Sequence, residues 1–426
     1  MSPAQLRILV PLENPHQEHN LVDLAATLAP SPWGELHLTH ILTPDAEPIP
    51  DIDQSLAALA DRAMARNIGA IAHLEEGADV TSAIQQAVHR WSCNMMLMAW
   101  KGDVERAAIL SAPNRALTKD TDVDTLIFKE KKRGPVRRIL VPFGGGNHAL
   151  VGVQIAYDLA QTWGAELEIL RIVRDSRDPS DPILQRYCAQ LAADTRLQLE
   201  LLKIDVPLTV IPAIDVVPAI VARAQDHDLI VLGASNDWRQ EEHLAGSIPD
   251  EIAYQVPCSV LMVRSAAAND LQLSRIFWEH TIRLNLAPKD KWDAIAQMVD
   301  ALIEEKQIPA SERQTVLEAA LDRERKGSTS LGHSTAIPHA PIPDLEGIIG
   351  CLGICRQGID FEGPTSDLVH FIFLLLTPEQ NYRSYIPILA QIATLMHADT
   401  THRDMLASQT PAEITAVLKR LPQPSR

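Results

Sequence analysis

The stretch RILVPL at residues 7–12 returns as RILVPF at residues 138–143. The segments that follow repeat as well. DLAATLAPSPWGELHL at 23–38 corresponds to DLAQTWGAELEIL at 158–170, and CNMMLMAW at 93–100 corresponds to HDLIVLGA at 227–234. The offset is about 130 residues each time, and a constant offset of this size indicates a duplicated domain.

Each copy alternates short apolar runs with segments of helical length. Continuous β-branched and leucine runs in this arrangement predict a parallel sheet covered by helices on both faces. Ligands of such sheets bind beyond the carboxyl ends of the strands. The expected strands lie near 7–11, 35–42, 70–74, 94–99 and 124–128 in the first copy, and near 138–142, 166–173, 207–212, 228–232 and 258–263 in the second.

The pattern changes after a small, polar segment, SAAANDLQLSR at 265–275, which is typical of a linker. The segment 291–305 has apolar residues on one helical face, Ser311 and Gln314 form a capping-box pattern, and Thr410 precedes Pro411 as an expected N-cap. We therefore expect an α/β protein with two tandem doubly wound parallel-sheet domains and a C-terminal α/β domain. Its expected parts are residues 1–132, 133–266, a linker at 267–280, and 281–426.

The composition of the chain indicates which partners and which cellular location to expect. The 426 residues include 55 Asp and Glu against 38 Lys and Arg, a net charge of −17, so nucleic acid is not an expected partner. Five scattered cysteines predict reduced cytosolic thiols. The start of the chain lacks the pattern of a signal peptide, and the apolar run FIFLLL at 371–376 is far too short for a membrane span. We expect a cytoplasmic location, either as a detached partner of a membrane transporter or as the soluble tail of a longer membrane protein.

Both copies resemble the universal stress protein family. The resemblance rests on the ILVP strand and on the family's Gly-x2-Gly-x9-Gly-Ser motif, whose glycine-rich loop lets backbone N–H groups approach phosphates. It implies that the second copy could bind an adenine nucleotide, ATP or AMP, and that the first copy is structural; no cofactor is otherwise expected. The motif in the second copy is Gly233, Asn236, Gly246 and Ser247; in the first it is Ala99, Gly102, Ala112 and Pro113. Asparagine thus replaces the middle glycine in the second copy.

The stretch LGHSTAIPHA at 331–340 places His339 directly after Pro338. From the residues alone, His339 could be a surface residue, a metal ligand or a nucleophile. Its spacing to His333 fits no common helix face and no cysteine pair lies nearby, so we expect no metal site. A neutral imidazole with its ordinary pKa of about 6.5 is a competent nucleophile near neutral pH, and the proline restricts the backbone beside it.

Residues 281 to 422 resemble the enzyme IIA domain of the phosphotransferase system, of the fructose/mannitol and nitrogen-regulatory type. The resemblance rests on RERKGSTSLGHSTAIPHA at 323–340, GIDF at 358–361 and LVHFIFLLLTP at 368–378. It implies that His339 accepts a phosphoryl group from a histidine phosphocarrier protein and that Arg323 is its charge partner.

Further residues could support the phosphate in that site. Ser334 and Thr335 could supply hydroxyl donors. Tyr385 stands where members that pass phosphate to a sugar-specific partner carry a second histidine, which argues against onward sugar phosphorylation. His333 is either a substitute for that histidine or a half-exposed loop residue.

The resemblances together predict a regulatory protein linked to a membrane transporter, such as a cation/proton antiporter or an amino-acid permease. The tandem domains would sense a small ligand or form a homo-oligomer, and the C-terminal domain would be phosphorylated on histidine. Two alternatives stay open: a phosphotransfer relay enzyme of a sugar phosphotransferase system, and an interaction scaffold with a vestigial site.

Overall fold

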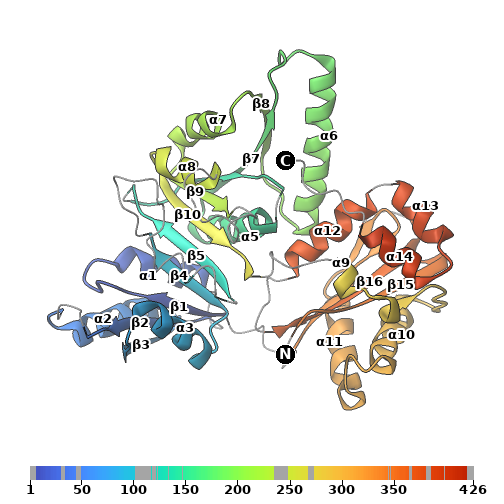
Figure 1. Ribbon diagram of the computed structural model, residues 1–426, viewed down its shortest axis with the longest axis horizontal. Coiled ribbons are helices and arrows are strands. Elements are labelled where there is room, and N and C mark those ends of the chain that lie inside the picture. Colours follow the sequence, from blue (N-terminus) through green and yellow to red (C-terminus); the bar gives the residue numbers. More distant parts are fainter. Residues whose placement is uncertain are drawn as a thin grey trace. The chain divides into compact units, whose positions relative to one another are not determined.

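The computed structural model divides into two compact units, residues 1–196 with 204–269 and residues 197–203 with 270–426 (Figure 1). Each unit is described separately below. The residues described are 6–29, 34–44, 49–100, 117, 121, 123–132, 134–145, 147–234, 248–266, 273–343, 345, 347–363, 367–379, 385–397 and 399–419.

The first unit contains two consecutive halves with the same order of strands in the sheet. The first half comprises β1 (Leu6–Pro11), α1 (His19–Leu28), β2 (Gly34–Leu42), α2 (Ile52–Met64), β3 (Gly69–Glu76), α3 (Val80–Arg90), β4 (Met95–Ala99) and β5 (Asp124–Lys129). The second comprises β6 (Arg138–Pro142), α5 (Asn147–Trp163), β7 (Glu166–Arg174), α6 (Pro182–Leu201), β8 (Leu208–Ala213), α7 (Val216–Arg223), η1 (Ala224–Asp226), β9 (Leu229–Gly233), α8 (Ile248–Gln255) and β10 (Ser259–Arg264). The ten strands expected from the sequence are confirmed.

One sheet of ten strands runs through both halves, in the order β3-β2-β1-β4-β5-β10-β9-β6-β7-β8. Pairing within each half is parallel, as expected, whereas β5 and β10 pair antiparallel, with Leu126 opposite Val263 and Phe128 opposite Leu261. The last strand of each half is thereby covered by that of the other half, which removes two exposed sheet edges. The two copies are therefore joined into one sheet rather than forming two.

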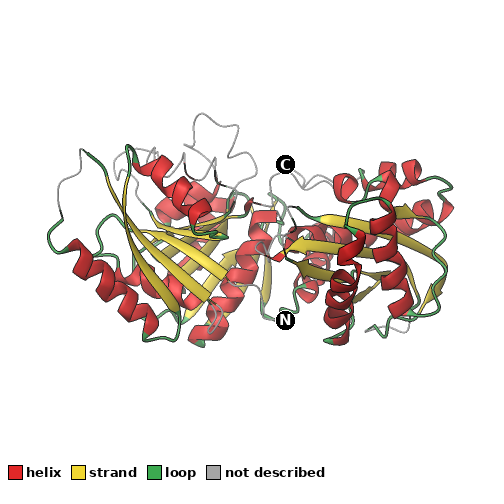
Figure 2. Cartoon of the chain, turned by 90° about the horizontal axis from the view of Figure 1, so that it is seen from below, coloured by secondary structure: helices red, strands yellow, loops and turns green. Residues whose placement is uncertain are grey.

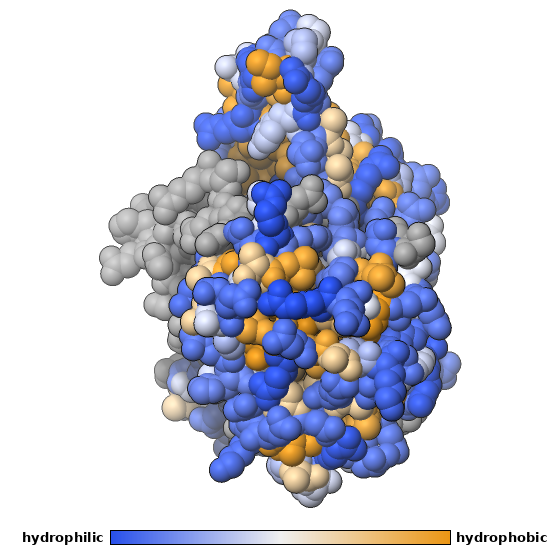
Figure 3. Space-filling model, turned by 90° about the vertical axis from the view of Figure 1, so that its right-hand side faces the viewer, coloured by the Kyte–Doolittle hydropathy of each residue, from blue (hydrophilic) through white to orange (hydrophobic). Residues whose placement is uncertain are grey.

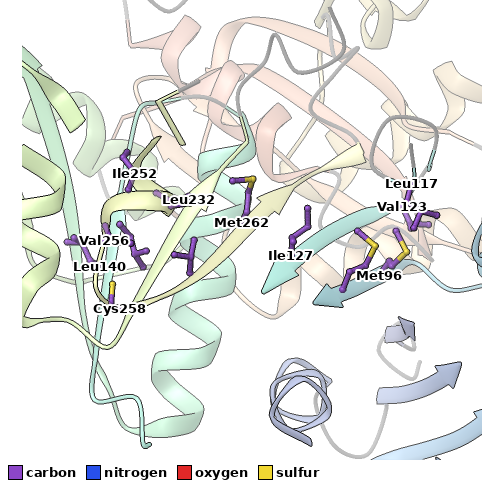
Figure 4. Packing of buried hydrophobic residues seen from close by; sticks show 14 of the residues in the cluster. Met96, Leu117, Val123, Ile127, Leu140, Leu232, Ile252, Val256, Cys258 and Met262 are labelled. Atoms are coloured by element: carbon purple, nitrogen blue, oxygen red, sulfur yellow. The ribbon is translucent and has the colours of Figure 1, made fainter. Parts of the chain in front are cut away.

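Helices cover both faces of this sheet (Figure 2). Helices α3, α7 and α8 bury their apolar residues in a cluster that also takes in Met96 of β4, Ile127 of β5 and Met262 of β10 (Figure 4). Helices α1 and α5 pack together, and Gly152 of α5 lies against Val231 and Val263 on the other face of the sheet. The cluster in Figure 4 thus contains residues of both halves, which explains why the two halves form a single compact unit.

The second unit is a smaller α/β fold. Its elements are α9 (Leu273–Ile276), η3 (Glu279–Thr281), β11 (Ile282–Arg283), α10 (Lys291–Glu304), η4 (Ala310–Glu312), α11 (Arg313–Arg325), β12 (Ser330–Gly332), β13 (Thr335–Ala336), β14 (His339–Ile342), β15 (Ile349–Ile359), β16 (Val369–Pro378), α12 (Ile386–Met396), α13 (Asp399–Ala407) and α14 (Pro411–Leu418). The sheet order is β11-β15-β16-β13-β12, and β14 also pairs with β16. Helices α10 and α11 pack on one core cluster, and α9, α12 and α14 pack on another.

Two local expectations for this unit have different outcomes. Thr410 caps α14, where its hydroxyl accepts a hydrogen bond from the Glu413 N–H, so the expected N-cap is confirmed. The capping box at Ser311 is wrong, because the chain forms the 3-10 turn η4 there and α11 begins at Arg313, without a side-chain cap.

The segment 267–280, expected as a linker, contributes three residues to the second core. Leu273, Ile276 and Phe277 are buried there, and the ring of Phe277 meets Phe373 of β16 edge-on. Residues 267–272 lie outside the described part of the chain.

The cysteines are unpaired, and the surface that Figure 3 draws is mostly hydrophilic. All five cysteines are free thiols, and four of them are buried. Within the described ranges, no helix has the length and apolarity needed to cross a membrane. The face drawn in Figure 3 is largely hydrophilic, with apolar patches between hydrophilic side chains, as is normal for a folded protein surface.

Candidate functional site

His339 is the first residue of β14, at a point where the chain is held firmly. This strand pairs with β16, and His339 lies opposite Leu375. The residue before it, Pro338, is buried, and its carbonyl accepts a hydrogen bond of 2.9 Å from the Leu375 N–H. The half-buried imidazole therefore projects from a backbone fixed by both the sheet and a proline.

Both ring nitrogens of His339 have partners. Nδ1 lies 2.9 Å from the carbonyl oxygen of Ile337, and Nε2 lies 3.0 Å from Nε of Arg323. A carbonyl only accepts and a guanidinium only donates, so Nδ1 carries the proton and the lone pair of Nε2 accepts the hydrogen bond from Arg323. Because Pro338 separates Ile337 from His339, its fixed φ helps to aim that carbonyl at the ring.

The environment keeps the imidazole uncharged. Burial and, to a lesser extent, the positive charge of Arg323 together lower the pKa of His339 from its ordinary value of 6.5 to about 4, although the hydrogen bond to the Ile337 carbonyl opposes the change. At neutral pH the ring is therefore neutral, with Nε2 available as a nucleophile.

Arg323 lies in the last turn of α11 and is held from two sides. Besides its bond to His339, its Nη1 donates to the carbonyl oxygen of Gly327 at 3.2 Å. A guanidinium in this position presents further N–H groups beside Nε2, and their planar fork suits the oxygens of a phosphate. The two residues expected to form the centre of the site are thus in direct contact.

Tyr385 also lies at His339. Its ring stacks on the imidazole, with centroids 5.1 Å apart and planes 25° from parallel. Tyr385 immediately precedes α12, so the amino end of this helix faces the site. A phenol can donate a hydrogen bond to a phosphate but carries no positive charge.

His333 lies elsewhere. Its exposed ring packs edge-on against His397, with centroids 4.8 Å apart, just beyond the carboxyl end of α12. The helix has 11 residues and is therefore about 16 Å long, with Tyr385 and His339 at its opposite end. His333 is too far away to share a group bound to His339.

Ser334 and Thr335 belong to the same distant region. Thr335 is fully buried, its hydroxyl donates to the carbonyl of His333, and it pairs with Phe371 on β16. Since His339 pairs with Leu375 on the same strand, Thr335 and His339 are about 13 Å apart along the sheet. The carbonyl of Ser334 accepts hydrogen bonds from the backbone N–H groups of His370 and Phe371. The structure does not bring these two hydroxyls to the imidazole.

Glu324 is a residue of the site region that sequence reasoning did not single out for a role. It is 2% exposed, and it accepts hydrogen bonds from the backbone N–H and the hydroxyl of Thr329. A signal was present in the sequence, because Glu324 continues the buried helical row of Val316 and Ala320 at intervals of four residues.

In the second half of the first unit, Gly233 ends β9 and packs closely on α5. A Cβ at this position would lie 2.5 Å from the backbone nitrogen of Ala149, so only glycine fits. Asn236, Gly246 and Ser247, together with Gly102, Ala112 and Pro113 of the first copy, lie outside the described residues. The described part of the chain contains no cluster of three or more side chains that could hold a metal ion.

Comparison with known proteins identifies both kinds of domain. Residues 275–421 match the family model of the phosphoenolpyruvate-dependent sugar phosphotransferase system, EIIA 2, and residues 135–264 match that of the universal stress protein family. A nitrogen regulatory protein of Bradyrhizobium diazoefficiens is 34% identical over 112 residues, which cover 26% of this chain and 73% of that protein. The chain therefore belongs to the EIIA 2 family and also carries a universal stress protein domain.

Two further proteins are similar to parts of the chain. The fructose-specific EIIABC component of Bacillus subtilis is 26% identical over 150 residues, which are 35% of this chain. The chain spans only 23% of that relative's length. The crystal structure of a universal stress protein from Archaeoglobus fulgidus has 17% sequence identity, covers 61% of this chain and 96% of its own, and superposes with a TM-score of 0.42.

Proposed function

We propose that the C-terminal domain accepts a phosphoryl group on Nε2 of His339 from a histidine phosphocarrier protein, and that this phosphorylation serves as a regulatory signal. The observation that carries the proposal is the pair of contacts on the imidazole, with Ile337 holding Nδ1–H and Arg323 bonded to Nε2. Membership of the EIIA 2 family supports the same reaction class.

The transfer itself is a displacement at phosphorus. The P–N bond of the donor's phosphohistidine breaks as the Nε2 lone pair forms a new P–N bond, and the donor imidazole leaves with its electron pair. Nδ1 keeps its proton throughout, because the Ile337 carbonyl holds it. Arg323 must release the lone pair, and its guanidinium then pairs with the oxygens of the bound phosphoryl group.

Tyr385 supports regulation in preference to onward transfer. Its ring covers one face of His339, where a charged imidazole would be needed to stabilise a phosphoryl group leaving for a second partner. The phosphorylated domain would then act by binding or releasing a partner, and a membrane transporter is the partner that we favour. A relay enzyme of a sugar phosphotransferase system and a scaffold with a vestigial site are the two alternatives.

The direct test is labelling of the full-length chain with radioactive phosphoenolpyruvate, enzyme I and a phosphocarrier protein. The label should be acid-labile and base-stable, should be absent from His339→Ala, and should persist in His333→Ala. Label that stops on His339 supports regulation, whereas label that passes to a cysteine-bearing IIB protein supports the relay. Absence of label with several phosphocarriers supports the scaffold.

We further propose that both halves of the first unit are universal stress protein domains, at residues 1–132 and 133–266, and that the enzyme IIA domain occupies 281–426. The shared strand order of the two halves supports this proposal. The second half would bind an adenine nucleotide near Gly233, and a homo-oligomer would form through these domains. Calorimetry of the full-length chain with ATP, ADP and AMP tests the binding; affinity no better than millimolar for all three refutes it. Gly246→Asp should abolish any binding seen.

A further inference from the structure

Glu324 is a buried residue that directly follows Arg323 in the sequence, and Arg323 contacts the proposed nucleophile His339. One of its oxygens, Oε2, accepts hydrogen bonds from the backbone N–H of Thr329 at 3.1 Å and from the Thr329 hydroxyl at 2.6 Å. Thr329 is itself 5% exposed. A buried carboxylate with two such bonds fixes the segment that donates them, because releasing the segment would leave the charge without donors.

The segment held in this way, residues 327–329, supports both partners of His339. The carbonyl of Gly327 accepts the 3.2 Å bond from Arg323, whose Nε contacts Nε2 of the imidazole. The carbonyl of Thr329 accepts a 3.0 Å bond from the backbone N–H of Ile337, whose own carbonyl holds Nδ1–H. Each ring nitrogen is therefore connected to segment 327–329 through one intermediate residue.

Lys291 supplies the opposite charge for Glu324. Its ammonium group is buried and lies 3.7 Å from Oε1 of Glu324. The same group donates to Glu362 at 2.7 Å and lies 4.7 Å above the ring of Trp292. The pKa of Glu324 is raised, because burial outweighs the Thr329 bonds and the Lys291 charge, which both lower it. Moving any of these groups would leave a buried charge without its partner, which is strongly unfavourable, so the arrangement is fixed.

We propose that Glu324 is a positioning residue for phosphorylation: through segment 327–329 it fixes the orientation of Arg323 and the tautomer of His339. This inference rests on the proposed function of His339 as a phosphoryl acceptor. Glu324 is 2% exposed, so it acts on the reaction without touching the phosphoryl donor.

The test is nitrogen-15 NMR of the histidine rings in the full-length, unphosphorylated chain, together with the rate of labelling by the phosphocarrier. The variants are Glu324→Ala and the milder Thr329→Val, which keeps the backbone N–H but lacks the hydroxyl. Thr329→Ser retains the hydroxyl and is the conservative rescue. Glu318→Ala, an exposed position on the same helix, is the matched control.

In the wild type and in Glu318→Ala, we expect His339 to show one tautomer, with the proton on Nδ1. In Glu324→Ala and Thr329→Val the two tautomers should exchange, and the maximal labelling rate should fall on the order of tenfold, as expected for a misplaced nucleophile. The concentration of phosphocarrier at half-maximal rate should not change. Thr329→Ser should restore both the tautomer and the rate.

A single Nδ1–H tautomer and a wild-type rate in a folded Thr329→Val protein overturn the proposal, whether or not Glu324→Ala folds. If the wild type is not labelled by any phosphocarrier, the proposed function fails, but the tautomer measurement still decides the positioning role. A tautomer that shifts equally in Glu318→Ala also overturns it, because the effect would then belong to the helix as a whole.

Discussion

Replacing Arg323 by alanine should weaken the phosphorylated state far more than the fold. In the unphosphorylated protein Arg323 makes two hydrogen bonds, one to Nε2 of His339 and one to the carbonyl of Gly327. In the proposed phosphorylated state its guanidinium leaves Nε2 and pairs with the oxygens of the phosphoryl group. A charge-assisted hydrogen bond contributes on the order of 2 kcal/mol, which corresponds to about a 30-fold lower equilibrium fraction of phosphoprotein.

The substitution also acts on the nucleophile itself. The charge of Arg323 is one cause of the low pKa of His339, so that pKa should rise in Arg323→Ala. Burial is the larger cause, and the rise should therefore leave the imidazole mostly neutral at pH 7.5. At that pH the expected loss is one of phosphate stabilisation, with the nucleophile still in its reactive form.

The assay is the equilibrium distribution of label between a phosphocarrier of known concentration and the full-length chain. The matched control is Arg325→Ala, an exposed cation in the same turn that pairs with Asp322. Circular dichroism should show both variants folded. A labelled fraction in Arg323→Ala within twofold of the control would refute the assignment of Arg323 as the phosphate's charge partner.

Three further predictions concern pH, the second histidine position and the glycine of the stress-protein fold. Because the pKa of folded His339 is about 4, the labelling rate should stay level from pH 8 to 5. Between pH 6.5 and 4 the imidazole takes up a proton in the unfolded chain but not in the folded one, so the free energy of unfolding of the second unit should fall by up to about 3 kcal/mol as the pH is lowered through this range. Urea unfolding at each pH measures this loss, which should be absent from His339→Gln. Tyr385→His should place a second imidazole against His339 and permit transfer of label to a IIB protein, and a product that stays on His339 would contradict this role. Gly233→Ala should destabilise the first unit by about 2 kcal/mol in thermal unfolding, because its Cβ would clash with the start of α5, whereas Gly144→Ala, which has open space around it, should change little.

The sequence by itself determined the strands of the first unit and pointed to the two residues at the centre of the candidate site. The repeated apolar runs predicted all ten strands of the first unit, because buried parallel strands must be continuously apolar. Proline next to histidine and the arginine sixteen residues earlier pointed to His339 and Arg323, and these two side chains are in contact. Such features are local or carried by a recurring motif, so a linear reading can detect them.

Only the tertiary structure decided how the copies join and which neighbours reach the imidazole. The antiparallel pairing of β5 with β10 leaves no mark in the sequence, because an apolar strand reads the same whether its partner runs parallel or antiparallel. His333 lies six residues before His339 yet is separated from it by the length of α12, whereas Tyr385, far along the chain, stacks on the ring.

The burial of Glu324 is a second feature whose partners the sequence alone did not reveal. A glutamate in a helix is normally exposed, and its proposed role here depends on Lys291 and Thr329, which the fold brings to it from outside the helix. Sequence periodicity specifies which residues face a core, because it follows from helix and strand geometry alone. Which charged groups meet inside that core depends on packing between segments that are distant in the chain. Only the folded structure determines this packing.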